Sequence, residues 1–178
     1  MSTTHDELAG VVDLFGALTN TELADALGEL AFKKGQDVDE DALHVEIKSA
    51  IDAYALVEYK PADALGEPAD ESADEPGSET PTDDPETLIT VGPTAFPTLP
   101  ANAEDLPHIL DYERRTVDRD RLADQVSQRL TAEATAAVAS EDTDRAAELL
   151  DVAYDVEMWA SVETEEVRSK LAAVLPQD

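Results

Sequence analysis

Residues 4–35, THDELAGVVDLFGALTNTELADALGELAFKKG, contain two helices whose starts are marked by the sequence itself. Thr4 with Glu7 predicts a capping box, in which the hydroxyl and the carboxylate each bind a backbone N–H at the start of the helix. Thr19 with Glu22 repeats the pattern. Apolar residues recur every three or four positions after each cap, and a glycine follows each helix. The stretch therefore predicts two short amphipathic helices.

A third helix and a pair of strands are expected next. Asp39 can cap a helix that runs to Tyr54 with a single apolar stripe. Residues 56–59 (LVEY) and residues 87–91 (TLITV) have the composition and alternation of short strands. We expect these strands to pair as a hairpin whose loop is the stretch of chain between them. The predicted fold class is mainly α, with a small β-hairpin.

The stretch between the strands, residues 61–86, has the composition of a disordered segment. It holds five prolines and ten acidic residues, and it contains no lysine or arginine. Such a segment repels itself and cannot bury an apolar core. We therefore expect a first unit formed by residues 1–60 plus 87–100, an acidic disordered insertion at 61–86, and a C-terminal helical region at 101–178 that packs on the first unit.

An extended segment precedes the C-terminal region. In residues 92–100 (GPTAFPTLP), three prolines restrict the backbone and disfavour a helix. We expect Phe96 in this segment to dock on the core. Helices are then predicted from Arg119 to Ala139, from Thr143 or Asp144 to Met158, and from a cap at Thr164 to Leu175.

The chain is strongly acidic along its whole length. Of its 178 residues, 42 are Asp or Glu and 12 are Lys or Arg, which gives a formal net charge of -30. At low salt this charge opposes compaction, whereas at about 1 M salt the Debye length falls to about 3 Å and the repulsion is screened. We interpret the acidic surface as a halophilic adaptation. The alternative is an acidic protein that mimics nucleic acid or binds a basic partner.

Two further features bear on the cellular location. No apolar run approaches the roughly 20 residues of a membrane span, and residues 1–10 lack the pattern of a secretory signal. The chain also contains no cysteine, which excludes disulfides, thiolate metal sites and cysteine nucleophiles. We expect a cytoplasmic protein that does not contact membranes.

The N-terminal half resembles the winged-helix family of helix-turn-helix folds. The resemblance rests on residues 18–27 (LTNTELADAL) for the second helix, residues 39–54 for the third, and the two predicted strands for the wing. It implies a third helix that enters the major groove of DNA, with Lys and Arg on the phosphates. The third helix here carries five acidic residues against Lys48 alone. This charge favours a protein partner over DNA.

The whole chain also resembles an uncharacterised protein family of halophilic archaea. The similar stretches are residues 6–18 (DELAGVVDLFGAL), residues 92–100 and residues 149–159. This resemblance agrees with the halophilic interpretation and implies no activity.

Five of the basic residues lie close together in the sequence. They are Arg114, Arg115, Arg119, Arg121 and Arg129. Arginine binds phosphate and carboxylate bidentately, so this stretch is the candidate for contacts with a partner or an anion. Acidic residues interleave with the arginines, so ion pairs that join the two halves of the chain are the other interpretation. Lys48 and Trp159 are further candidate partner contacts. Trp159 follows Met158 at a spacing typical of a core or cap residue, and an exposed Trp159 would instead mark a partner-binding site.

Motifs for catalysis and for metal binding are missing from the sequence. There is no HExxH, GxGxxG, GxxxxGK[ST] or GxSxG, and the stretch that starts at Asp37 lacks the Gly and Glu of a calcium loop. We expect no enzyme, cofactor or metal site. The predicted function is a non-enzymatic, intracellular interaction or regulatory module of a halophile. The alternative is a winged-helix transcription regulator that uses Arg114 to Arg129 for phosphate contacts.

Overall fold

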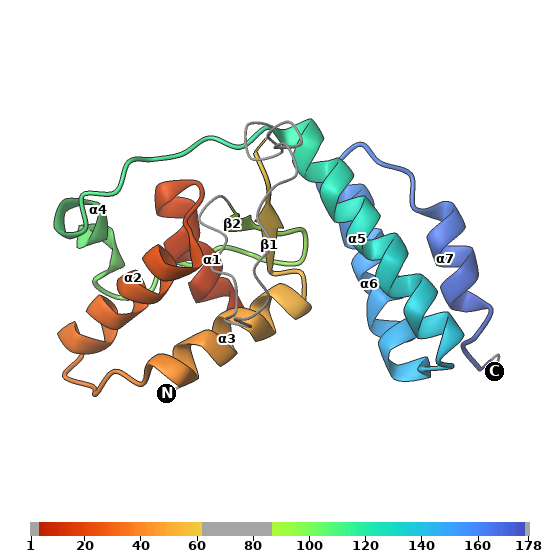
Figure 1. The fold of residues 1–178 in the computed structure, drawn as a ribbon, viewed down its shortest axis with the longest axis horizontal. Coiled ribbons are helices and arrows are strands. Elements are labelled where there is room, and N and C mark those ends of the chain that lie inside the picture. The colour runs from red at the N-terminus through yellow and green to blue at the C-terminus, as the bar shows by residue number, and fades with distance from the viewer. Residues whose placement is uncertain (1–3, 62–86, 177–178) are drawn as a thin grey trace, which may run out of the picture.

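The computed structural model describes residues 4–61 and 87–176, and it is mainly helical with one small antiparallel sheet (Figure 1). The elements in chain order are α1 (His5–Phe15), α2 (Asn20–Lys33), α3 (Glu40–Asp52), β1 (Leu56–Tyr59), β2 (Leu88–Val91), the 3-10 turn η2 (Ala103–Asp105), α4 (Leu106–Ile109), α5 (Arg119–Ala139), α6 (Thr143–Trp159) and α7 (Glu165–Ala172). The predicted fold class is confirmed. The predicted acidic insertion lies, apart from Pro61, outside the described residues.

The N-terminal helices begin at the predicted caps. Thr4 Oγ1 accepts a hydrogen bond from the Glu7 N–H at 3.2 Å, and the Glu7 carboxylate accepts one from the Thr4 N–H at 2.9 Å. Thr19 and Glu22 make the same two contacts at the start of α2. Asp39 caps α3 by accepting a bond of 3.1 Å from a backbone N–H. These caps satisfy amide groups that the helices themselves leave unpaired.

The two strands form the expected hairpin, which the chain between α1 and α2 extends. The antiparallel register pairs Leu56 with Val91, Val57 with Thr90, Glu58 with Ile89 and Tyr59 with Leu88. Leu18 joins the edge of β2, because its N–H donates to the Ile89 carbonyl at 3.0 Å and its carbonyl accepts from the Ile89 N–H at 2.6 Å. The Thr90 hydroxyl donates to the Gly16 carbonyl at 2.8 Å. The hairpin is thus fixed to the end of α1.

Buried apolar side chains form two clusters. The first joins α1, α2 and α3 around residues such as Phe15 and Leu23. The second fills the space among α5, α6 and α7, and it also includes Tyr54, Val57 and Tyr59 from the N-terminal half. Figure 1 shows the two groups of helices at opposite ends of the molecule, with the hairpin between them. The C-terminal helices therefore pack directly on N-terminal side chains.

The chain after β2 returns to the first cluster before it reaches α5. Ala103 and Leu106 are buried there, although they lie within the predicted C-terminal region 101–178. Lys33 at the end of α2 adds an ion pair of 3.6 Å with Asp105. By packing, η2 and α4 thus belong with the N-terminal helices.

Residues 111–118, here called the crossing segment, then run along one edge of the molecule from α4 to α5 (Figure 1). The Arg115 N–H donates to the Phe15 carbonyl at 2.8 Å. Gly16 has a positive φ of 76°, and a Cβ placed on it would lie 2.0 Å from the Arg115 carbonyl oxygen. Only glycine permits the crossing segment to approach α1 this closely.

The expectation for Phe96 was wrong. Phe96 does not dock on the core, because its side chain is 80% exposed. The backbone of its segment docks instead: the Phe96 N–H donates to Asp6 Oδ1 at 3.0 Å and the Thr98 N–H donates to the Asp6 carbonyl at 2.9 Å. A Cβ on Gly10 would lie 2.1 Å from the Thr98 carbonyl oxygen, so the backbone of this segment lies directly against α1.

Thr164 precedes α7 as expected, but its side chain makes no capping bond. Its buried hydroxyl donates to the Ala153 carbonyl at 3.1 Å and lies 2.8 Å from the Glu157 carboxylate. The threonine therefore joins α7 to α6. At the start of α6, the helix begins at Thr143 as predicted, and Asp142 supplies the capping oxygen.

Candidate functional site

The arginines of the candidate partner site contact other parts of this chain. Arg115 donates to Glu22 Oε1 at 2.8 Å and to the Ala17 carbonyl at 3.3 Å. Arg114 donates to the Leu14 carbonyl, also at 3.3 Å. Both contacts attach the crossing segment to the helices of the first cluster. These two arginines therefore link the crossing segment to the N-terminal helices, as the second interpretation of the arginine stretch expects.

The other predicted contacts are divided between internal and exposed positions. Arg121 Nε donates to the Lys60 carbonyl at 3.0 Å, next to the end of β1. The Arg119 guanidinium lies 5.0 Å from the centre of the Trp159 ring, which is half-buried against the second cluster. Lys48 is exposed and pairs with Asp52 at 3.0 Å. The structure thus distributes these residues over several surfaces, and a role in partner binding stays a prediction for each of them.

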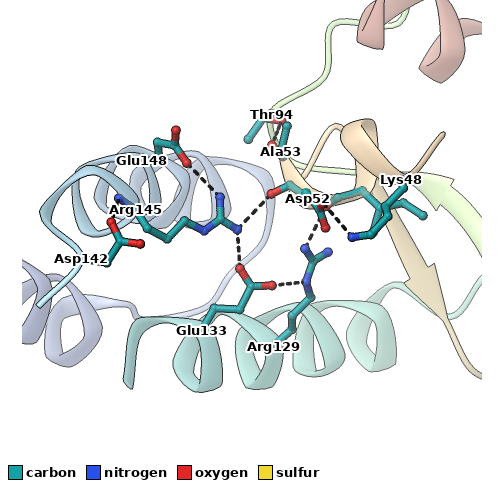
Figure 2. Close-up of polar contacts among 10 residues, drawn as sticks. Lys48, Asp52, Ala53, Thr94, Arg129, Glu133, Asp142, Arg145 and Glu148 are labelled. Atoms are coloured by element: carbon teal, nitrogen blue, oxygen red, sulfur yellow. Dashed lines mark hydrogen bonds and ion pairs between the residues drawn. The ribbon is translucent and has the colours of Figure 1, made fainter. Parts of the chain in front are cut away.

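A polar cluster at the end of α3 holds the two groups of helices together (Figure 2). Arg129 on α5 donates to the Ile51 carbonyl at 2.9 Å and to Glu133 at 2.7 Å. Arg145 on α6 donates to the Asp52 carbonyl at 3.1 Å and to the other oxygen of Glu133. We call Arg129, Glu133 and Arg145 the α3 clamp. The two cations bind carbonyl groups at the C-terminus of α3, where the helix dipole favours positive charge.

Tyr54 lies beneath this clamp. Its side chain is fully buried, its backbone has a positive φ of 61°, and the Arg129 guanidinium lies 4.0 Å from the centre of its ring. Burial raises the pKa of the Tyr54 phenol above its ordinary value. The ring therefore acts as a neutral anchor under a cation, in the geometry of a cation–π contact.

A hollow lies between the C-terminal half of α2 and the N-terminal half of α3. It has a volume of about 700 Å³ and we call it the α2–α3 groove. Its apolar lining is Leu27, Leu30, Ala31, Val38, Ala42, Leu43 and Pro100, and its charged lining is Glu7, Lys34, Asp37, Asp39 and Glu46. This groove was not predicted from the sequence. The available signal was Val38, an apolar residue between two aspartates in a polar turn.

Residues 6–176 match the family of unknown function DUF7109. The chain belongs to this family. No curated protein and no solved structure matches the chain. The expected membership of an uncharacterised family is confirmed, and the DUF7109 region covers both groups of helices.

Within residues 4–61 and 87–176, no group of three or more His, Asp or Glu side chains is arranged to hold a metal ion. In the same part of the chain, no helix combines the length and apolar character that crossing a bilayer requires.

The ion pair between Arg115 and Glu22 predicts an acid-dependent change in stability. The Arg115 hydrogen bond holds the pKa of Glu22 below its usual value, and the Thr19 N–H acts in the same direction. Because the pKa is lower in the folded state, this contribution to the free energy of unfolding is complete above the unfolded pKa and is lost as the pH falls through the folded pKa. We expect Glu22→Gln to lower the Tm at pH 7 and to lower it less at about pH 4.

Thermal unfolding followed by circular dichroism at several pH values measures this difference. Glu29→Gln on the same helix is the control, because no ion pair to Glu29 is found among the described residues. A Tm difference between wild type and Glu22→Gln that stays constant with pH would contradict the assignment.

Proposed function

We propose that the protein is a non-enzymatic interaction module that docks another protein on its N-terminal helices in a high-salt cytoplasm. The observation that carries this proposal is the use of the arginines. Arg114, Arg115, Arg121 and Arg129 donate to groups of this chain, while the charged residues exposed on α3 are acidic apart from Lys48. Nucleic acid would need free cations on that surface, whereas a protein partner does not.

The finer fold proposal is a winged-helix-like N-terminal unit. It is supported by the order of three helices and a hairpin, and by the bridge between Leu18 and Ile89 that adds a third short segment to the sheet. In such a unit the third helix is the reading helix. Here α3 is capped by Asp39 and begins with Glu40 and Asp41, so its N-terminal turn would repel phosphate.

Exposed apolar side chains on the same helices support a protein partner. Phe32 on α2 is 73% exposed and Val45 on α3 is 67% exposed. Such side chains are candidate contacts with a partner, because a few large apolar residues supply most of the binding free energy of a protein interface.

The first experiment follows the helical content of the purified protein from about 0.1 to about 3 M KCl, and tests duplex DNA binding by gel shift on the same samples. We expect the circular dichroism signal to increase with salt, because screening removes the repulsion that a net charge of -30 creates. We expect no DNA shift at any salt at which the protein is folded. A DNA complex under those conditions would favour the transcription regulator instead.

The matched positive test uses immobilised protein in about 2 M KCl, where weak charge contacts are screened. A partner should be retained in stoichiometric amount by wild type and lost from Phe32→Asp and Val45→Asp. Tyr154→Asp on α6 is the control, since Tyr154 is also exposed but lies on the C-terminal helices. Equal retention by all variants would contradict docking on α2 and α3.

A further inference from the structure

We propose that the α2–α3 groove binds a basic amphipathic helix of the partner protein. This inference rests on the proposed function, because it names the surface and the chemical class of the bound segment. A groove between two helices with an apolar floor is the usual receptor for the apolar face of a third helix.

The floor of the groove is apolar and is supported from below. Leu27 and Leu30 lie at its base and belong to the first core cluster, and Leu43 on α3 packs against that cluster. Val38 is 45% exposed at the edge, where its Cγ1 lies 3.7 Å from the position that a Cβ on Gly28 would take. Because the floor is part of a packed core, its shape is fixed before a partner binds, which reduces the entropic cost of binding.

The rim of the groove is negatively charged. Four carboxylates line it, from Glu7, Asp37, Asp39 and Glu46, against the single ammonium of Lys34. Two of the four are held in place by helix capping, since the Glu7 carboxylate accepts the Thr4 N–H and Asp39 caps α3. A segment with apolar residues on one face and Lys or Arg beside them would complement both the floor and the rim.

Charge also decides among the possible occupants. DNA, RNA and anionic lipid would be repelled by the four carboxylates. A second copy of this chain would bring another net charge of -30, and its arginines in the crossing segment already bind the first cluster. A basic helix from a different protein is not repelled by the carboxylates, and its cations are available to pair with them.

The test measures fluorescence anisotropy of a labelled synthetic helix of about 18 residues, with Leu on one face and Lys on the others. The full chain is used at the lowest KCl concentration that gives full helicity and at about 3 M KCl. A second peptide has Glu at every Lys position. We expect the Lys peptide to bind and the Glu peptide to bind at least about tenfold more weakly at the lower salt.

Three variants locate the site. Asp37→Lys with Glu46→Lys should weaken binding of the Lys peptide by about tenfold or more, whereas Asp151→Lys with Glu163→Lys, the same charge change on exposed C-terminal residues, should change it by less than about twofold. Val38→Asp adds a negative charge to the rim but removes an apolar contact. If the apolar floor contributes to binding, the Val38→Asp variant binds the Lys peptide more weakly than wild type. If attraction between charges were the only cause of binding, the variant would bind the Lys peptide more tightly.

The inference is overturned if the Lys peptide does not bind, if both double variants lose binding equally, or if Val38→Asp binds more tightly. These outcomes leave the proposed function standing, provided that wild type still retains a partner that Val45→Asp loses. DNA binding by the folded protein would instead remove the proposed function itself. Circular dichroism of each variant shows whether it has folded.

Discussion

Gly16→Ala is expected to lower the free energy of unfolding by about 3 kcal/mol or more. Gly16 has a φ of 76°, which costs an alanine about 1 to 2 kcal/mol. In addition, the new Cβ would lie 2.0 Å from the Arg115 carbonyl oxygen, so the crossing segment would have to move away from α1. That movement would break the hydrogen bond between the Arg115 N–H and the Phe15 carbonyl.

Gly35→Ala is the matched control for this prediction. Gly35 has a similar φ of 68°, but nothing lies within 4 Å of the position that its Cβ would take. The loss of unfolding free energy in Gly35→Ala therefore comes only from placing an alanine at a positive φ, and we expect about 1 kcal/mol. Urea unfolding in about 2 M KCl gives both values at a constant ionic strength. Equal losses in the two variants would show that the close approach at Gly16 carries no cost of its own.

Glu133→Ala is expected to lower the free energy of unfolding by about 2 kcal/mol. Glu133 accepts hydrogen bonds from Arg129 at 2.7 Å and from Arg145 through its other oxygen. Each of the three side chains is less than one third exposed. Removal of the carboxylate leaves two partly buried cations that repel each other at the end of α3. Because some solvent reaches them, the cost is smaller than for a fully buried pair.

Glu148→Ala is the control for the α3 clamp. Glu148 also binds Arg145, at 3.0 Å, but its side chain is 67% exposed. Exposed ion pairs contribute at most about 1 kcal/mol and frequently nothing measurable, so we expect a loss below about 0.5 kcal/mol. The same urea experiment compares the two variants. If Glu133→Ala and Glu148→Ala lose equal stability, the clamp does not hold α3 to the C-terminal helices.

The helix starts could be predicted because their causes are local. Thr4 with Glu7 and Thr19 with Glu22 are three residues apart, so the chain itself brings the bonding atoms together at the first turn. The hairpin could also be predicted, since its two short runs have the composition of strands, although both faces are buried: Leu56 belongs to the first cluster and Val57 to the second. Membership of a family of unknown function agreed with the resemblance in the sequence, whereas the halophilic origin stays a prediction.

The errors arose where a distant segment decided the outcome. The exposed position of Phe96 accompanies a close approach between the backbones of Thr98 and Gly10, which lie far apart in the sequence, and no local pattern reports that approach. The cap expected at Thr164 is absent because Ala153 and Glu157 on α6 bind the same hydroxyl. A local signature predicts a possible bond, and packing decides whether a competing partner is closer.

For the candidate site too, local features could be predicted and contacts between distant residues could not. The sequence located the arginines but not their partners, because Leu14, Ala17 and Ile51 offer only backbone carbonyls, which every residue has. The α2–α3 groove could not be predicted for a related reason. A groove is a property of how two helices are spaced, and the spacing of α2 and α3 depends on the whole first cluster.

The place of Tyr54, Val57 and Tyr59 in the second cluster has a consequence for dissecting the protein. A fragment that ends at residue 100 would lose the α5–α7 surface that buries these three side chains, and a fragment that begins at residue 101 would lack the rings that complete its interior. Expressing the two fragments separately would therefore expose apolar surface on each of them. Co-expression of both pieces is the arrangement in which each would recover its missing contacts.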